Sequence, residues 1–328
     1  MRYRTLGRLG WQVSEIGYGM WGIAGGPGGF TGGADYDTAP ACLDLAVELG
    51  CNFFDTAAAY GRGISEQMLG ALLRRHPDRK LYVATKLAPK NMAWPPGAGD
   101  TLDDVFPATY IRERTYESLE NLGVSRADLL QLHVWEDRWA KDERWQEALR
   151  ELKSEGVIGA VGISVNRWEP ANCLAALDTG LVDVIQVIYN IFDQAPEDEL
   201  FPRIKRDDIA VIARVPFDEG TLAGAISADS SWPDGDWRNT YFGPENLGPS
   251  VEHFNELIAD VGNAMPSPEL ALRFILANPA VSTVIPGMRK LEHVRTDLAV
   301  SDDRVLDSDL LARLRRHRWD RVPAWWSG

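Results

Sequence analysis

Cysteine is scarce in this chain of 328 residues, with only Cys42, Cys51 and Cys173 present. Their number is odd and their spacing is not that of a metal site, so the sequence predicts neither a disulfide framework nor a metal centre. We expect Cys42 and Cys51 to be packing residues, the first in a helix and the second at the start of a buried strand. Reduced thiols are typical of cytoplasmic proteins, and a cytoplasmic location is therefore predicted.

Long apolar runs are also missing. None approaches the ~20 residues of a membrane-spanning helix, and Met1 to Gly7 lack the apolar centre of a signal peptide. Basic residues are outnumbered, since 34 Lys and Arg against 48 Asp and Glu give a formal charge of −14. This balance argues against a nucleic-acid-binding surface, although a local basic cluster can still hold an anionic cofactor. We expect neither a membrane nor a nucleic acid as partner.

Eight short hydrophobic runs with the character of β-strands recur along the chain, with helix-like segments between them. Hydrophobic residues make up 45% of the chain, which is enough for a sizeable core. The alternation predicts an α/β fold of the (β/α)8 (TIM) barrel type, as a single domain over residues 1–328. Long loops at the carboxyl face and an extra C-terminal helix complete the predicted fold. The strand-like runs are 16–18, 51–55, 81–86, 129–133, 160–164, 182–189, 209–214 and 281–286.

An open, doubly wound sheet is the alternative architecture. Its usual signal is a glycine-rich turn that leads from the first strand directly into a helix. The glycine-rich stretch 25–33 has no G-x-G-x-x-G frame and does not open a helix directly, so we interpret it as a loop over the barrel mouth. The segment 227–250 is predicted to be a long loop after the seventh strand, and such loops in compact domains are often functional.

Four chemically active residues gather at the ends of the predicted strands. Asp55, Lys86 and His133 each close a hydrophobic run, and Tyr60 follows Asp55 by five residues. In neighbouring parallel strands these side chains emerge at one carboxyl edge, which is where barrel active sites lie. A carboxylate, a phenol, an ammonium and an imidazole at one place suit proton transfer.

The charges in this group predict a role for each member. An ammonium about 4 Å from a phenol supplies on the order of 4 kcal/mol at an effective dielectric of ~20. That exceeds the roughly 3 kcal/mol needed to lower a phenol pKa of ~10 by two units. We therefore expect Lys86 to make Tyr60 acidic and Asp55 to keep Lys86 charged. His133 is expected to donate a hydrogen bond to a substrate oxygen, and a hydride would have to come from a cofactor.

Asp55 to Gly61, followed by Ser65-Glu66 and Leu69-Gly70, resembles the signature of the aldo-keto reductase superfamily. The resemblance continues in the family's order along almost the whole chain. It implies an NAD(P)-dependent oxidoreductase that transfers a hydride between nicotinamide and a carbonyl or alcohol, such as an aldehyde, a ketone or a sugar. In that family Tyr60 would be the acid in reduction and the base in oxidation. The other matching motifs are Thr85-Lys86, 130–133, 162–164, Gln186 with Tyr189-Asn190, and 285–289.

The same resemblance implies an extended cofactor across the barrel mouth. Residues after the first strand would line the nicotinamide and substrate region, and residues at the fifth and sixth strands would hold the nicotinamide carboxamide. The segment 216–224 would wrap the pyrophosphate. Arg289 would contact the 2′-phosphate of the adenosine. Trp21 and Trp135 would form the substrate pocket. The predicted cofactor-binding residues are Gly19, Met20, Trp21, Ser164, Asn166, Gln186, Arg214, Pro216, Phe217, Gly220, Leu222, Gly287, Arg289, His293 and Asp297.

Three departures from the family pattern bear on the cofactor. Val165 separates Ser164 from Asn166, whereas the family often has the two polar residues adjacent. Arg214 stands where an aromatic ring commonly stacks on the nicotinamide, and its planar guanidinium can stack similarly. Asp297 would repel a nearby phosphate, which weakens the preference that Arg289 suggests. NADP(H) is nevertheless favoured over NAD(H).

Two other functions are compatible with these residues. Barrel aldolases also place a lysine at a strand end, so Lys86 could be the nucleophile of a Schiff-base lyase; the adjacent Asp55 argues against this, because a nucleophilic lysine should be neutral. The chain could instead be a non-catalytic nicotinamide sensor or scaffold, which the complete tetrad disfavours. The substrate, the direction of the reaction and the oligomeric state stay open.

Overall fold

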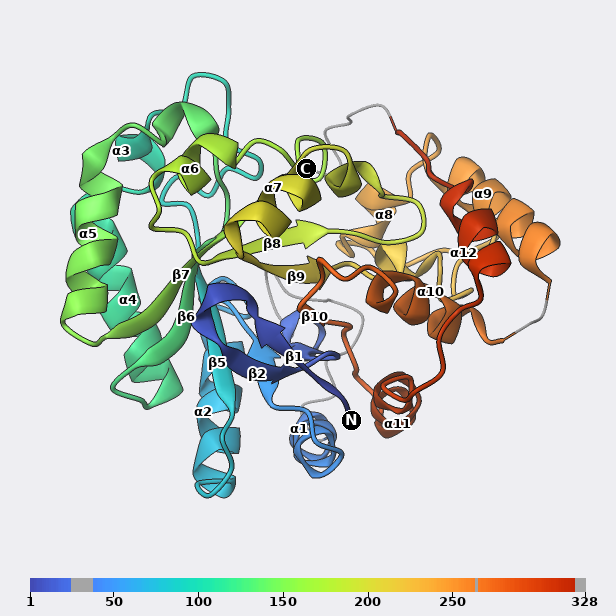
Figure 1. The fold of residues 1–328 in the computed structure, drawn as a ribbon, viewed down its shortest axis with the longest axis horizontal. Coiled ribbons are helices and arrows are strands. Elements are labelled where there is room, and N and C mark those ends of the chain that lie inside the picture. Colours follow the sequence, from blue (N-terminus) through green and yellow to red (C-terminus); the bar gives the residue numbers. More distant parts are fainter. Residues whose placement is uncertain (25–37, 263–264, 322–328) are drawn as a thin grey trace.

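The computed structural model describes residues 1–24, 38–262 and 265–321 (Figure 1). The glycine-rich stretch 25–33, expected to be a loop over the barrel mouth, lies outside the described residues. So do Trp325 and Trp326.

A parallel eight-stranded sheet runs through the chain in sequence order. Parallel bridges from Ile16 to Val284 and from Gly19 to Gly287 join its first and last strands, so the sheet closes on itself. Each predicted run overlaps one strand, and the (β/α)8 barrel prediction is confirmed. The strands are β3 (Tyr18–Gly19), β4 (Phe53–Asp55), β5 (Tyr82–Leu87), β6 (Ala127–Leu132), β7 (Ile158–Ser164), β8 (Val184–Ile188), β9 (Ala210–Arg214) and β10 (Thr283–Val284).

Helices surround the sheet, with α4 and α5 on one side in Figure 1 and α9, α10 and α12 on the other. Helix α5 shows why they form: Trp145, Ala148, Leu149 and Leu152 are buried on one face at helical spacing. The predicted C-terminal helix is present as α12. The helices are α1 (Ala39–Glu48), α2 (Ile64–Arg75), α3 (Leu102–Val105), α4 (Ala108–Leu122), α5 (Glu143–Ser154), α6 (Leu174–Asp178), α7 (Leu200–Asp207), α8 (Arg238–Tyr241), α9 (Leu247–Val261), α10 (Ser267–Leu276), α11 (Leu291–Ala299) and α12 (Ser308–Arg315).

The prediction of one irregular loop over 227–250 is wrong in part. Helix α8 lies inside this segment, and α9 has already begun at Leu247. The polar composition of the segment, rich in Asp, Asn, Gly and Pro, hid these two helical stretches because it resembles turn chemistry.

An N-terminal hairpin, which the sequence did not reveal, packs against the amino end of the barrel. Strands β1 (Tyr3–Leu6) and β2 (Trp11–Ser14) pair antiparallel, and Arg8 N donates to Asp208 O at 2.7 Å just before β9. Leu6 and Val13 are fully buried. They belong to the apolar cluster inside the barrel, together with Phe53, Ala84, Leu129, Ala160, Val184, Ala210, Ile212 and Ile285.

A polar layer lies directly above this apolar one. Side chains two residues apart on a strand face the same side, so Asp55 follows Phe53, Lys86 follows Ala84 and Gln131 follows Leu129 into the barrel. Gly162 makes room for this layer, because a Cβ there would lie 2.8 Å from Gln131 Cγ. The strand period therefore places the functional side chains on an apolar floor.

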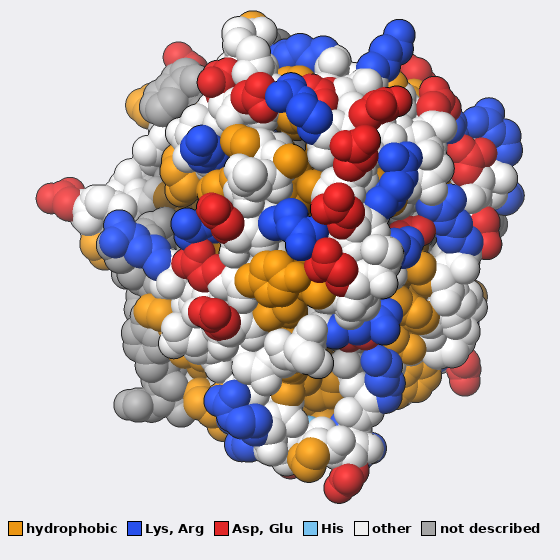
Figure 2. All heavy atoms as spheres, turned by 90° about the vertical axis from the view of Figure 1, so that its left-hand side faces the viewer, with side chains coloured by type: hydrophobic (Ala, Val, Ile, Leu, Met, Phe, Trp, Pro, Cys, Tyr) orange, Lys and Arg blue, Asp and Glu red, His pale blue; other side chains and the backbone are white. Residues whose placement is uncertain are grey.

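Charges of both signs are interspersed on the face over α4 and α5 (Figure 2). Arg112 pairs with Glu155 at 2.9 Å, and Arg144 pairs with Asp103 at 2.8 Å. The acidic excess of the chain is thus not gathered on this face. Within the described ranges, no helix combines the length and the apolar character needed to cross a bilayer.

Two helical glycines predict opposite effects of the same substitution. A Cβ on Gly70 in α2 would overlap the carbonyl oxygen of Leu122 at the end of α4, whereas a Cβ on Gly248 in α9 meets nothing within 4 Å. We expect Gly70→Ala to lower the free energy of unfolding by about 1–3 kcal/mol through overpacking. Gly248→Ala should raise it by up to about 1 kcal/mol, because alanine favours helix. Urea unfolding of both variants measures this, and equal effects would contradict the packing described.

Candidate active site

Lys86 lies at the centre of the polar layer, and its side chain is fully buried. Its ammonium donates to Asp55 Oδ1, to the carbonyl of Thr56 at 2.9 Å and to the phenol oxygen of Tyr60 at 3.3 Å. The other carboxylate oxygen of Asp55 accepts from Gln131 Nε2 at 3.0 Å and Gln186 Nε2 at 2.9 Å. The predicted contact between lysine and tyrosine is therefore present, and the ion pair is held by two amides.

The expectation that Tyr60 is unusually acidic is wrong. Burial raises the pKa of Tyr60, and the nearby Lys86 opposes this rise without cancelling it. Burial alone would lower the pKa of Lys86, but Asp55 and Tyr60 outweigh that effect and the net shift is upward. At neutral pH the site thus holds a protonated phenol beside a charged ammonium.

His133 follows β6 and completes the group of four. Burial, with the positive charges of Lys86 and Arg214, sets the pKa of His133 well below its usual value, so the imidazole is neutral. Its ring centroid lies 5.6 Å from that of Tyr60. Its Nδ1 atom is buried and has no hydrogen-bond partner among the described residues. A neutral imidazole carries one N–H and can donate it to a ligand oxygen.

The prediction of Trp135 as a pocket residue is wrong. Its side chain is buried in the core between sheet and helices, with ring centroids 5.8 Å from Trp139 and 4.9 Å from Trp145. Trp94 instead stands beside the site: its ring is edge-on to His133 at 4.5 Å, and 38% of its surface is exposed. Its position in the loop after the strand that carries Lys86 was the available signal, since such loops build barrel sites.

Residues expected near the nicotinamide lie at the carboxyl ends of β3, β7, β8 and β9. Ser164 is buried and pairs with Gln186 in the strand ladder. Asn166 uses its side-chain oxygen to accept from the backbone N–H of Trp168 at 3.0 Å, which leaves its amide group as a donor. Arg214 donates from Nη2 to the carbonyl of Val165 at 3.1 Å, while its buried Nε has no partner among the described residues.

The first strand contributes mainly backbone to this region. Gly19 N donates to Pro286 O at 2.9 Å, and a Cβ on Gly19 would lie 2.7 Å from the carbonyl of Ile285. The side chain of Met20 is fully buried in the core, so it is not available to a ligand. Trp21 packs edge-on against Trp237 of the segment after β9, with ring centroids 5.2 Å apart.

The segment that follows β9 has an unusual backbone. Val215, Asp218 and Glu219 have φ values of 54°, 44° and 57°, and Gly220 has 109°. Left-handed backbone costs about 1–3 kcal/mol at each non-glycine residue and persists only where the surroundings enforce it. Such strain clusters at ligand-binding segments. Pro216 and Leu222 are buried under this turn, whereas Phe217 is half-buried.

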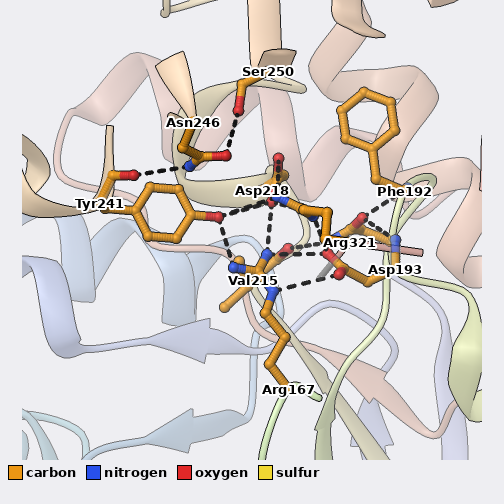
Figure 3. Close-up of polar contacts among 10 residues, drawn as sticks. Arg167, Phe192, Asp193, Val215, Asp218, Tyr241, Asn246, Ser250 and Arg321 are labelled. Carbon is orange, nitrogen blue, oxygen red and sulfur yellow. Dashed lines mark hydrogen bonds and ion pairs between the residues drawn. The ribbon is translucent and has the colours of Figure 1, made fainter. Parts of the chain in front are cut away.

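A buried ion-pair cluster surrounds Asp218 (Figure 3). Three side chains from separate parts of the chain bond to Asp218: Arg167, Tyr241 and Arg321. Both arginines also pair with Asp193. Sequence reasoning missed this cluster because its members are spread from Arg167 to Arg321, nearly half of the chain, and no spacing pattern links them.

Cationic side chains lie at and just before the start of α11. Arg289 is half-buried and lies against Gly22, where a Cβ would be 3.1 Å from the arginine Cδ. Burial and the neighbouring Arg238 lower the pKa of Arg289. Burial also lowers the pKa of the surface residue His293, with help from Lys290 and Arg289.

Asp297 does not carry the full negative charge that we expected. It lies buried on α11, and burial raises its pKa to about 7. The carboxyl is therefore about half protonated at neutral pH, which reduces the expected repulsion of a phosphate.

These residues fit a nicotinamide dinucleotide. Buried polar atoms without partners among the described residues, His133 Nδ1, Arg214 Nε and Thr221 Oγ1, lie on the segments that leave β6 and β9. The left-handed turn after β9 and the cationic residues that follow Gly287, Arg289 and Lys290, provide further groups that can bind an anion. Such a distribution suits a ligand with a polar ring at one end and phosphates along its length.

Comparison with known proteins decides the family. The sequence model of the Aldo/keto reductase family matches residues 15–318. The chain belongs to the aldo/keto reductase family. It is 32% identical to an uncharacterized oxidoreductase, YqkF of Bacillus subtilis, over 97% of this chain and 96% of that protein. It is 30% identical to the NADH-specific methylglyoxal reductase of Escherichia coli, over 94% and 96%.

A solved structure agrees with this assignment. The holo form of the aldo-keto reductase AKR11C1 from Bacillus halodurans aligns with a TM-score of 0.77 and 27% identity over all of both chains. This aldo/keto reductase is therefore an NAD(P)-dependent oxidoreductase that acts on small carbonyl or alcohol substrates.

The buried carboxyl of Asp297 predicts a pH-dependent gain from Asp297→Asn. The pKa of Asp297 is about 7 in the folded protein and ~3.9 in an unfolded chain. Below about pH 4 both states are protonated and the carboxyl has no effect. As the pH rises toward 7 only the unfolded state ionises, so the folded state loses stability relative to it. The variant should therefore unfold at higher urea than the wild type at pH 8 and at nearly the same urea at pH 4.5.

The exposed Asp303 offers a control for this measurement. Asp303→Asn should shift unfolding little at either pH, because its carboxyl is surrounded by water in both states. A gain for Asp297→Asn that is equal at the two pH values would contradict the assignment.

Proposed function

We propose that Tyr60 is the general acid when this aldo/keto reductase reduces a carbonyl, and the general base when it oxidises an alcohol. The observation that carries the proposal is the 3.3 Å contact between Lys86 Nζ and the phenol oxygen, inside a fully buried Lys86–Asp55 pair. A proton donor at neutral pH must hold its proton beforehand, and the raised pKa of Tyr60 meets that requirement.

Each neighbour of Tyr60 has a distinct part in the proposed reaction. The reduced nicotinamide, when bound, supplies the hydride. His133 donates its N–H to the carbonyl oxygen and orients it toward the phenol. Tyr60 gives its proton to that oxygen and becomes a phenolate, which the Lys86 ammonium stabilises by about 5 kcal/mol at an effective dielectric of ~20. Asp55 keeps Lys86 charged throughout.

A Schiff-base lyase is not favoured. The pKa of Lys86 is raised by Asp55 and Tyr60 against the effect of burial. A lysine nucleophile has to be neutral to attack a carbonyl. The same ion pair that supports proton transfer therefore works against imine formation.

Tyr60→Phe tests the assignment. It removes the proton donor and leaves the ring, so we expect turnover to fall by about 10²–10⁴-fold. Cofactor affinity, measured by quenching of protein fluorescence on titration with NADPH, should change less than about threefold. Tyr116→Phe is the matched control, because that phenol is exposed and bonded to Glu155 on the surface. Full turnover of the Tyr60 variant would exclude the proposed role.

We propose NADPH as the preferred cofactor. Arg289 and Lys290 stand at the start of α11, where backbone N–H groups and the helix dipole attract an anion. Arg238 lies close enough to lower the pKa of Arg289, while Asp236, which pairs with Arg238 at 2.6 Å, acts in the opposite direction. The partial protonation of Asp297 removes part of the opposing repulsion. A relative that is named NADH-specific makes this preference worth measuring directly.

Arg289→Met should separate the two cofactors. Loss of a charge-assisted contact with the 2′-phosphate is expected to weaken NADPH binding by about 10–100-fold, since such bonds contribute roughly 1.5–3 kcal/mol. NADH lacks that phosphate, and its affinity should change little. Arg295→Met, an exposed arginine on the same helix, is the control. Equal weakening of both cofactors would contradict a 2′-phosphate role for Arg289.

The proposed substrate site is walled by aromatic rings. Trp94 stands beside His133, and Trp21 lies at the end of β3 against Trp237. We propose that the substrate is a small carbonyl compound that packs against these rings. Activity assays on a panel of aldehydes, ketones and sugars would identify the substrate class. Methylglyoxal belongs in the panel because a relative is named for it. A cytoplasmic location stays a prediction, supported by the three buried cysteine thiols.

A further inference from the structure

The segment after α12 returns to the barrel instead of leaving it. Trp319 N donates to the carbonyl of Phe192 at 2.9 Å, and the Trp319 ring lies 6.0 Å from Phe192 and 4.1 Å from His253, centroid to centroid. This packing fixes the segment against the loop that follows β8 and against α9. As a result, the side chain of Arg321 is buried next to Asp193 and Asp218.

Arg321 and Arg167 share the same two carboxylates (Figure 3). Arg321 Nη2 lies 2.9 Å from Asp193 Oδ2 and 2.8 Å from Asp218 Oδ1. Arg167 Nη2 lies 3.0 Å from Asp193 Oδ2 and 2.6 Å from Asp218 Oδ1. The hydroxyl of Tyr241 donates to Asp218 Oδ1 at 3.2 Å and accepts from Arg167. Asp218 therefore has three partners from three distant segments.

The cluster has equal numbers of positive and negative charges and is largely buried. The side chains of Asp218, Arg167 and Arg321 are 0%, 2% and 3% exposed. Two arginines face two aspartates, so removal of one arginine leaves two carboxylates that share a single cation. The uncompensated negative charge in this buried cluster is unfavourable. Burial would lower the pKa of Arg321, but Asp218 and Asp193 outweigh it and raise that pKa. Arg321 is therefore charged, and its charge is directed at the carboxylates of Asp193 and Asp218.

Asp218 is also part of the strained turn. Val215, Asp218, Glu219 and Gly220 all have positive φ. The carbonyl of Val215 accepts from Asn190 Nδ2 at 3.0 Å, and the same amide group lies 3.0 Å from Asp193 Oδ2. Both ends of the turn are thus tied to the ion-pair cluster. A backbone in this conformation depends on such outside contacts, because the residues themselves do not favour it.

We propose that Arg321 is a positioning residue for cofactor binding: from the C-terminal segment it holds Asp218, and through Asp218 the turn 215–220, in the shape that receives the dinucleotide. Arg321 acts through Asp218 and takes no part in the hydride or proton transfer. The inference rests on the proposed function, because it takes this turn to be part of the cofactor site.

Arg321→Gln tests the inference in the full chain. We expect the Kd for NADPH, from fluorescence titration, to rise about tenfold or more. The kcat at saturating NADPH and the KM for the carbonyl should stay within about twofold, since the tetrad is untouched. Arg321→Lys keeps the charge but has no two-pronged guanidinium, and it should give an intermediate Kd. A loss of folded protein alone would lower the active fraction and leave the Kd of the remaining sites unchanged.

Arg318→Gln is the matched control. Arg318 lies three residues earlier in the same segment and pairs with Asp198 at 2.7 Å and with Asp320 at 2.7 Å, on the exposed surface. Its replacement should leave the Kd for NADPH unchanged. If Arg321→Gln does not fold, Asp218→Asn approaches the same contact from the turn and should raise the same Kd.

The outcomes distinguish this inference from the proposed function. A wild-type protein that binds neither NADPH nor NADH would remove the proposed function and the inference with it. A wild type that binds cofactor, with an unchanged Kd in the Arg321 and Asp218 variants, would overturn the inference alone. A fall in kcat at saturating cofactor with an unchanged Kd would overturn it as well.

Discussion

The buried ion pair between Lys86 and Asp55 is the interaction on which the proposed active site depends. An ammonium and a carboxylate are costly to remove from water, and breaking such a pair by loss of one partner costs about 3–5 kcal/mol. The fold compensates with hydrogen bonds: the ammonium also reaches the Thr56 carbonyl and Tyr60, and the carboxylate accepts from two glutamine amides. Lys86 therefore carries its charge at neutral pH, and a phenolate at Tyr60 has a cation beside it.

This pair requires the rest of the barrel to be arranged around it. Its floor is the apolar cluster that the N-terminal hairpin completes with Leu6 and Val13, and Gly162 leaves the space that Gln131 occupies. One end of the barrel thus provides stability and the other provides chemistry, as is usual for this architecture. His133 and Arg214 add polar atoms at the upper end that stay buried without partners among the described residues.

The cluster around Asp218 solves a similar problem at the rim. Charges there are buried in a balanced set, and their partners come from the loop after β7, the loop after β8, α8 and the C-terminal segment. The strained turn next to this cluster keeps its shape because other parts of the chain hold it. In the role proposed for Arg321, the shape of this turn depends on a residue that is remote from it in sequence.

The pattern of the sequence was sufficient for the barrel and for the tetrad. Short hydrophobic runs and the helical segments between them are local properties of the sequence. Residues that close neighbouring parallel strands must meet at one edge, so Asp55, Lys86 and His133 could be brought together without coordinates. The hairpin was not predicted because its strands are four residues long and partly polar. Helix α8 was not predicted because turn-forming residues surround it.

What only the tertiary structure decided was the environment of each group. Trp135 is only two residues from His133 in sequence, yet its ring packs against Trp145 in the core. Trp94 is distant in sequence, yet its ring lies beside His133. The pKa of Tyr60 rises because burial outweighs the ammonium, and burial is a sum over neighbours from the whole chain. Arg167, Asp193, Asp218 and Arg321 form one cluster for the same reason. Sequence determines which residues share a strand or a helix face, whereas the depth of burial and the partners of a charge exist only once distant segments pack together.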